Sequence, residues 1–267
     1  MRTNGGSVLS VLMAAAMACA VLALVSGPAD ALTVDLSSST QGTINGAIFT
    51  INDLQPAGSG VIDPFLTVQN SPSEQGYNSG TNDNFDTKRV PQFNHEITVG
   101  SLAKVTLNGT QYYEFLVDVN EPNGGSKALI SLDRLKLYTS ATTQSSVSTD
   151  ASGLFNGSLG TLRYDMDGAP AGNSVVLYDD RHHGSGQADI TIFVPVTNFA
   201  DAAASDFLYM YQAWGYTAGY KSEATFEETA ALRAIAGSPA AVPESSTVLL
   251  LGSGLVGVGT LMRLRRR

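Results

Sequence analysis

The residues best suited by type to metal chemistry lie at 179–183, where the chain reads Asp-Asp-Arg-His-His. Carboxylates and imidazoles are the usual ligands of zinc and related metals. Adjacent residues of an extended chain point to opposite sides, so His182 and His183 do not easily reach one ion. The Gly-Ser-Gly that follows at 184–186 indicates a solvated hairpin loop. We therefore expect no transition-metal site here.

Two groups of aspartates have the oxygen chemistry that calcium prefers. Asp83 and Asp86 lie in an Asn-Asp-Asn-Phe-Asp run, and Asp165 and Asp167 are two apart near the end of an expected strand. Such residues can converge on one ion, but they are also favoured in turns, where they bond to nearby backbone. The glycine and terminal glutamate of an EF-hand loop are missing from the first group. We expect a solvated loop at 82–86 and a turn ending at Gly168, with calcium as the alternative and no other cofactor.

Catalytic chemistry has weak support in the sequence. No Gly-x-Ser-x-Gly elbow occurs in residues 32–238, and His95 beside Glu96 is the only histidine outside the 179–183 group. Glycoside hydrolysis needs only two carboxylates facing one cleft, and spacing alone cannot identify such a pair. The sequence therefore favours a non-enzymatic protein, with a secreted glycoside hydrolase or carbohydrate-binding module as the alternative.

Aromatic rings give the best candidates for sugar contact, because rings stack on the apolar faces of sugars. Trp214, Tyr216 and Tyr220 fall in a glycine-containing segment that we expect to be exposed. Tyr209 and Tyr211 alternate within an expected strand, which favours a place in the core or between sheets.

These side chains must be positioned by β-strands, because short alternating or apolar runs recur along the chain. The clearest element is a hairpin, with strands on either side of a turn at Asn108 and Gly109. Pro195 predicts an edge or a strand end. Residues 207–214 predict a strand covered on both sides. Further strands are expected at 47–51, 61–68, 131–138, 159–165, 174–178 and 189–196, with loops at 69–94 and 139–152, and residues 224–236 fit either a strand or a short helix.

About twelve short strands without long amphipathic helices predict an all-β fold. We expect a two-sheet antiparallel β-sandwich, jelly-roll-like, over residues 32–238. Between residues 32 and 241 the chain has 10 Lys and Arg and 22 Asp and Glu, which gives a net charge of −12. This charge repels nucleic acid, which we exclude as a partner.

The N-terminus has the pattern of a secretory signal peptide. Arg2 precedes a long apolar run at 8–25, and Ala29 and Ala31 form an Ala-x-Ala cleavage site. Residues 1–31 are therefore predicted to be a signal helix that the Sec machinery and signal peptidase process. Cleavage after Ala31 removes Cys19, the only cysteine, so the mature protein has no disulfides.

The C-terminus has three parts in a fixed order. Val242, Pro243 and Glu244 are followed by an uncharged apolar segment at 247–262 and then by four arginines, Arg263, Arg265, Arg266 and Arg267. Sixteen helical residues reach about 24 Å, a little short of the hydrocarbon core of ~30 Å, and snorkelling arginines help to complete the span. Arginine clusters stay cytoplasmic, so the body of the protein is expected on the far side of the membrane.

This arrangement at 239–267 resembles the PEP-CTERM sorting tag of bacterial surface proteins. The resemblance implies a Gram-negative exported protein whose partner is an exosortase in the inner membrane. It implies that Val242, Pro243 and Glu244 are the recognition residues, that 247–262 is a transient transmembrane anchor, and that the arginines stop transfer. The family's second proline is Ser245 here, which leaves open whether the protein is released or stays anchored. The resemblance further implies a cell-surface or matrix location and association with exopolysaccharide or a biofilm.

Overall fold

The computed structural model describes residues 31–51, 63–81, 84–122, 124–168, 174–179, 188–223 and 225–233. The predicted sorting tag and the signal peptide before Ala31 lie outside these residues. The described part is built of fourteen strands and three short 3-10 helices, so the all-β prediction is confirmed.

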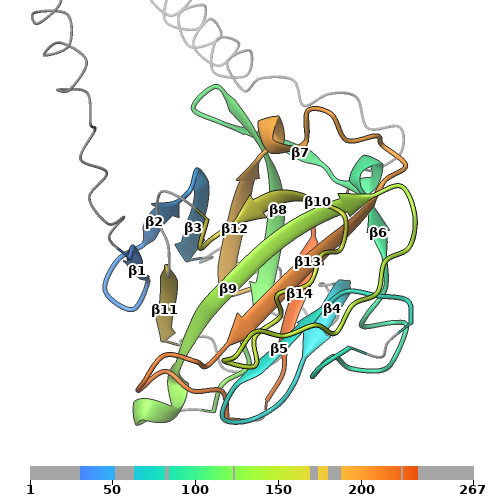
Figure 1. Cartoon of the computed structure of the whole chain (residues 1–267). Coiled ribbons are helices and arrows are strands. Elements are labelled where there is room, and N and C mark those ends of the chain that lie inside the picture. The colour runs from blue at the N-terminus through green and yellow to red at the C-terminus, as the bar shows by residue number, and fades with distance from the viewer. Residues whose placement is uncertain are drawn as a thin grey trace, which may run out of the picture.

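The strands form two sheets of seven strands each (Figure 1). The first sheet has the order β1 (Thr33–Asp35), β11 (Val175–Asp179), β9 (Leu129–Ser140), β13 (Phe207–Trp214), β5 (Glu74–Tyr77), with β10 (Thr161–Asp165) beside β9 and β6 (Ile97–Thr98) beside β13. The second has the order β2 (Gln41–Ile44), β3 (Ala47–Ile51), β12 (Ile190–Pro195), β8 (Thr110–Asp118), β14 (Glu227–Ala231), β4 (Pro64–Val68), with β7 (Lys104–Leu107) beside β8.

The two sheets pack face to face as a sandwich. The chain passes from one sheet to the other at both ends of the strand order, between β1 and β2 and between β4 and β5. The prediction of purely antiparallel sheets needs a correction, because β1 pairs with β11 in parallel and makes the first sheet mixed. The prediction had no signal for β1 and β2, which are only three and four residues long.

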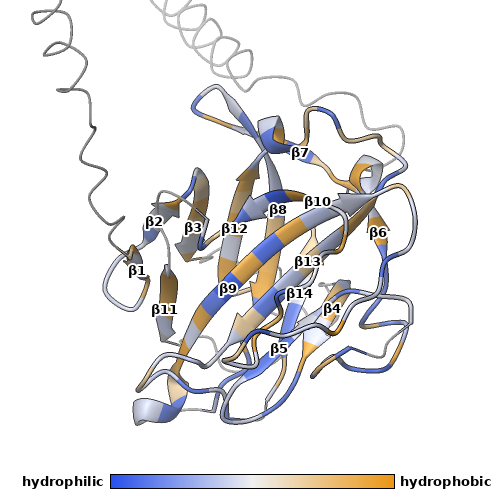
Figure 2. Cartoon of the chain, viewed as in Figure 1, coloured by the Kyte–Doolittle hydropathy of each residue, from blue (hydrophilic) through white to orange (hydrophobic). Residues whose placement is uncertain are grey.

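The core lies between the inner faces of the sheets, and alternation along the strands accounts for it (Figure 2). Tyr113, Phe115 and Val117 on β8 are buried, while Glu114 and Leu116 between them are half-buried. The hairpin of β7 and β8 is confirmed, with its turn at Asn108 (φ 50°) and Gly109 (φ 81°). Both residues have the positive φ that a two-residue hairpin turn requires.

Segment 69–94 is not the open loop that its polar composition predicts. It contains β5, which pairs with β13 and is buried at all four positions. Gly76 allows the close approach here, because a Cβ at this position would come within 2.9 Å of Val68. The side-chain amide of Asn84 bonds to both the N–H and the C=O of Tyr77 and completes the polar contacts of the strand.

Three further predictions can be compared with the burial and the order of the strands. β13 is buried on both faces, as its apolar and aromatic run predicts. Pro195 ends β12, which confirms the strand end, although β12 lies inside the second sheet and not at its edge. Within the segment predicted as either a strand or a short helix, residues Glu227–Ala231 form β14, a strand between β8 and β4.

Part of the outer face of the first sheet is covered by the loop that joins β9 to β10. Residues 141–153 are mostly exposed, as predicted, but Leu154, Phe155 and Leu159 pack onto the sheet. They cover Tyr209 and Tyr211, which are buried as expected but on the outer face of the sandwich. We call this group the outer aromatic cluster, which consists of Tyr77, Tyr138, Leu154, Phe155, Leu159, Tyr209, Tyr211 and Ala213.

Candidate functional site

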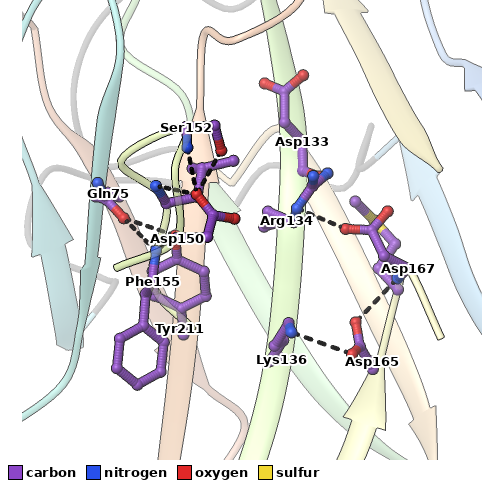
Figure 3. A network of polar contacts seen from close by, with 12 residues as sticks. Gln75, Asp133, Arg134, Lys136, Asp150, Ser152, Phe155, Asp165, Asp167 and Tyr211 are labelled. Carbon is purple, nitrogen blue, oxygen red and sulfur yellow. Dashed lines mark hydrogen bonds and ion pairs between the residues drawn. The ribbon is translucent and has the colours of Figure 1, made fainter. Parts of the chain in front are cut away.

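Ion pairs join β9 to the end of β10 on the outer face of the first sheet (Figure 3). Arg134 Nε lies 2.8 Å from an Asp167 carboxylate oxygen, and Lys136 Nζ lies 3.2 Å from an Asp165 carboxylate oxygen. Arg134 and Lys136 are two apart on β9, so their side chains project from the same face. The four charges therefore form two neighbouring pairs at a partly exposed surface.

The turn that follows β10 holds both aspartates in place. The Asp167 N–H donates to Asp165 Oδ1 at 3.0 Å, and the Gly168 N–H donates to the Asp165 carbonyl at 3.2 Å. The Asn45 amide donates to three carbonyls of this turn, those of Asp165, Met166 and Gly168. The predicted turn ending at Gly168 is confirmed.

Burial is the main electrostatic influence on Asp167. It raises the pKa of this carboxyl group to about 6, the charge of Arg134 opposes the shift, and the charge of Asp165 adds to it. Each of the two carboxylates, Asp165 and Asp167, faces a cation. A calcium ion at this place would have to displace Lys136 and Arg134.

Asp133, a buried carboxylate on β9, fixes the loop after β13. Asp133 Oδ2 accepts from the Ser131 hydroxyl at 2.7 Å and the Tyr216 N–H at 2.8 Å, and Oδ1 accepts from the Thr217 hydroxyl at 2.5 Å. Burial raises the pKa of Asp133, and these hydrogen bonds oppose the shift. The Ser131 hydroxyl also lies 3.2 Å from the Tyr220 carbonyl. The loop with Tyr216 and Tyr220 is thus held next to the ion pairs.

The expectation that Trp214 is exposed for sugar contact is wrong. Trp214 is 0 % exposed, and its Nε1 donates to Gln212 Oε1 at 3.2 Å. It is the last residue of β13 and points to the inner face, into the main core, because the strand continues to this position. Tyr216 and Tyr220, which follow it, are half-buried.

Polar groups that the sequence did not single out lie beside this surface in Figure 3. The Tyr211 hydroxyl lies 2.7 Å from Gln75 Oε1, which also accepts from the Phe155 N–H at 3.0 Å. Asp150 Oδ1 accepts from the N–H groups of Ser152 and Leu154. The Ser152 hydroxyl is the largest cause that lowers the pKa of Asp150, and Arg134 makes a smaller contribution. Their separation along the chain hid this grouping from sequence reasoning.

The other predicted metal ligands are dispersed or lie outside the described residues. Asp86 accepts from the Asn70 amide at 2.8 Å and the Gln75 N–H at 2.9 Å, so it joins the loop to β5. Asp83 and residues 180–183 are outside the described part, as are Ala29 and the tag residues 242–267. His95 Nδ1 lies 3.0 Å from the Pro91 carbonyl. Within the part of the chain that the structure describes, no three His, Cys, Asp or Glu residues are grouped to hold a metal.

Comparisons with models of known protein families, with curated proteins and with solved structures give no match to this chain. In the described ranges no helix has both the length and the apolar character needed to cross a membrane.

The ion pairs between β9 and the end of β10 provide hydrogen-bonding groups of both charges. The half-buried Tyr216 and Tyr220 lie on the loop that Asp133 of β9 fixes. The two carboxylates at the end of β10 are each paired with a cation.

Proposed function

We propose that this protein is an exported bacterial surface protein, non-enzymatic, that an exosortase sorts through its C-terminal tag. The observation that carries the proposal is the order of the tag, with Pro243 and Glu244 before the apolar segment 247–262 and the arginines at its end. The signal-peptide pattern that ends at Ala29 and Ala31 supports export through the Sec machinery. The final location in this proposal is the cell surface or the extracellular matrix.

The proposal includes the finer architecture of the chain. Residues 1–31 form a signal helix that is removed, residues 32–238 form a jelly-roll-like sandwich, and residues 239–267 form the tag with its transmembrane helix. The two stacked sheets support the middle part. The apolar composition and flanking charges of the ends support the other two.

Recognition of the Pro-Glu motif is tested by the Pro243→Ala variant. We expect this variant to accumulate in the inner membrane of exosortase-positive cells, because the recognition residues are incomplete, while the unchanged chain reaches the surface. Fractionation and immunoblotting measure the distribution. Ser246→Ala, which leaves Val242 to Glu244 intact, is the matched control, and equal surface amounts for both variants and the unchanged chain would refute recognition through Pro243.

We propose in addition that the outer face of the first sheet contacts exopolysaccharide. Tyr216 and Tyr220 are half-buried and lie on the loop that Asp133 fixes through backbone hydrogen bonds, and Asp133 precedes Arg134 on β9. Ring faces stack on sugars and the surrounding charged groups can hydrogen-bond to hydroxyls. The pairing of Asp165 and Asp167 with cations supports a binding role over hydrolysis.

The sugar contact is tested by pull-down with exopolysaccharide from the producing cells. Tyr216→Ala and Tyr220→Ala should each reduce the retained protein severalfold, because a stacking ring is lost. Tyr112→Ala is the control, since Tyr112 is an equally half-buried tyrosine on β8 of the second sheet. Retention that does not change in either loop variant contradicts the contact.

A further inference from the structure

Two hairpins of the second sheet are closed by the same two residues in the same kind of turn. Asn45 and Gly46 join β2 to β3, and Asn108 and Gly109 join β7 to β8. The φ angles are 48° and 83° in the first turn and 50° and 81° in the second. Since these angles match, a difference in reactivity between the two asparagines must come from the contacts of their side chains and of the glycines.

The Asn45 side chain is held by the opposite sheet. Its amide nitrogen donates to the carbonyls of Asp165 at 3.0 Å, Met166 at 3.1 Å and Gly168 at 2.7 Å, which belong to the turn after β10. Asn45 is half-buried at this place. Rotation of this side chain, or loss of its nitrogen, would remove the hydrogen bonds that join the turn of β2 and β3 to the first sheet.

The Asn108 side chain has no such contact. Asn108 and Gly109 are both exposed, and neither the Asn108 side-chain amide nor the Gly109 N–H forms a hydrogen bond with another residue of the described part. A Cβ at position 109 would meet no atom within 4 Å. Every residue of β7 is exposed or half-buried, so this end of the hairpin can open locally without disturbing the core.

We propose that Asn108 is a modification site, at which the side chain deamidates spontaneously through a succinimide, and that the contacts of Asn45 protect the matching turn. The Gly109 nitrogen bonds to Asn108 Cγ and the Cγ–Nδ2 bond breaks, so Nδ2 leaves as ammonia with the proton of the Gly109 N–H. Glycine favours this step because no Cβ shields its nitrogen. Water then opens the ring at Cγ to give aspartate, or at the main-chain carbonyl to give isoaspartate.

The modification changes the tip of the β7–β8 hairpin. Either product adds a negative charge, and isoaspartate also lengthens the main chain of the turn by one carbon. A two-residue turn depends on its backbone length and on positive φ angles, so isoaspartate at position 108 weakens the pairing of β7 with β8. This site depends neither on the sorting tag nor on the sugar contact.

The described part of the chain holds one more Asn-Gly pair, Asn156 and Gly157, and its contacts restrain it. Asn156 Oδ1 accepts from the Ser148 hydroxyl at 2.8 Å, and the Asn156 N–H donates to the Ser148 carbonyl at 3.0 Å. A Cβ at Gly157 would overlap Ser146 Oγ, so the glycine lies in a crowded place. We therefore expect Asn156 to react more slowly than Asn108.

The test follows the full chain in detergent during incubation at neutral pH. Peptide mapping by mass spectrometry, with separation of the aspartate and isoaspartate forms, measures conversion at each asparagine. Asn108 should convert at least about tenfold faster than Asn45, because the Asn45 amide must first give up several hydrogen bonds. Equal conversion at the two positions, or faster conversion at Asn45, would overturn the proposal.

Unfolding supplies the matched control. In urea concentrated enough to abolish the near-ultraviolet circular dichroism, Asn45 and Asn108 should convert at similar rates, because both are then Asn-Gly pairs of an open chain. Asn108→Gln should remove the products at position 108, and unchanged slow conversion at Asn45 would show that this variant is folded. If Asn108 converts only in urea, or if urea leaves the difference between the two positions as it was, the fold does not select Asn108 and the assignment is refuted.

Discussion

Glu227, at the start of β14, has an unusual environment for a carboxyl group. It is 0 % exposed, and neither of its carboxylate oxygens has a hydrogen-bond partner in another residue of the described part. It pairs across the strands with Val68 and shares a face with Thr229, which bonds to Gln212 of the other sheet. Its side chain therefore points between the sheets. Burial raises its pKa from 4.5 to about 8, and a contribution from its own backbone opposes the shift.

This pKa makes the stability of the fold depend on pH. The folded state retains a proton that the unfolded chain loses above pH 4.5, so the contribution to stability is complete below pH 4.5 and is lost as pH rises through about 8. Glu227→Gln cannot ionise and should remove this dependence. Between pH 5 and pH 9 the free energy of unfolding by urea should fall less in the variant than in the unchanged chain. The two decreases should differ by a few kcal/mol, which is the magnitude that a pKa shift of this size implies.

The comparison needs a control because Asp167 and Asp133 also have raised pKa values. Glu223→Gln removes an exposed carboxylate four residues earlier and should leave the pH dependence as it is in the unchanged chain. Parallel pH profiles for Glu227→Gln and the unchanged chain would show that Glu227 is ionised without penalty in the folded protein.

At single positions, the sequence predicted roles that depend on local chemistry. The predicted turn at Asn108 and Gly109 was correct because a two-residue hairpin turn requires residues that readily adopt a positive φ. The turn at Asp165 was correct because such residues bond to their own backbone. The expected exposure of Trp214 was wrong although the strand end at 214 was predicted correctly, because the burial of this last side chain depends on the packing of the main core around it. The pairing of Arg134 with Asp167 joins residues of different elements and had no local signal.

Among the elements, the loop between β9 and β10 depends on tyrosine hydroxyl groups of the sheet beneath it. The Tyr209 hydroxyl accepts from the Gln144 N–H at 2.8 Å, and the Tyr77 hydroxyl accepts from the Ser146 N–H at 3.0 Å. Val147, which directly follows these contacts, is 59 % exposed. The loop is therefore held by hydrogen bonds on one side and open to water on the other.

Tyr209→Phe removes the acceptor of the Gln144 N–H and keeps the ring that packs in the outer aromatic cluster. We expect hydrogen exchange of the Gln144 amide to become several times faster and the free energy of unfolding to fall by about 1 kcal/mol, the net value of one such bond. Tyr112→Phe is the control and should change neither quantity. Unchanged exchange at Gln144 in the first variant would show that the hydroxyl does not hold the loop.

The elements that the sequence predicted well are those with apolar alternation, such as β8 and β12, and the continuous apolar run that forms β13. β5 was missed because its residues, Glu-Gln-Gly-Tyr, form a strand through contacts with β13 and segment 84–87 and not through local propensity. β14 remained ambiguous because its two glutamates lie in a buried strand, which hydrophobic periodicity does not predict. In both cases tertiary contacts override the local sequence signal.

For the whole molecule, composition and strand spacing were enough to predict two stacked sheets, because the fold class depends on many weak signals that add together. The order of the strands could not be predicted from the sequence, because it depends on pairings between residues more than 100 positions apart, such as Ile190 with Ile51. The candidate outer face follows from this order, so it could not be predicted in advance.

The central claim about the whole molecule is that the protein is exported and then sorted to the cell surface. It depends on the tag at 239–267, whose three parts are read directly from the sequence. Export and sorting make a specific covalent prediction, because processing at the Pro-Glu motif must remove the apolar segment and every arginine after it.

The most direct test is the mass of the C-terminal peptide of the protein recovered from cells with and without the exosortase. We expect a new C-terminus close to Glu244 in exosortase-positive cells and a chain that still ends at Arg267 in cells that lack the enzyme. Ser245→Pro, which introduces the second proline of the PEP-CTERM pattern that the tag resembles, should give the same new terminus. A chain that retains Arg267 in exosortase-positive cells would contradict the sorting claim.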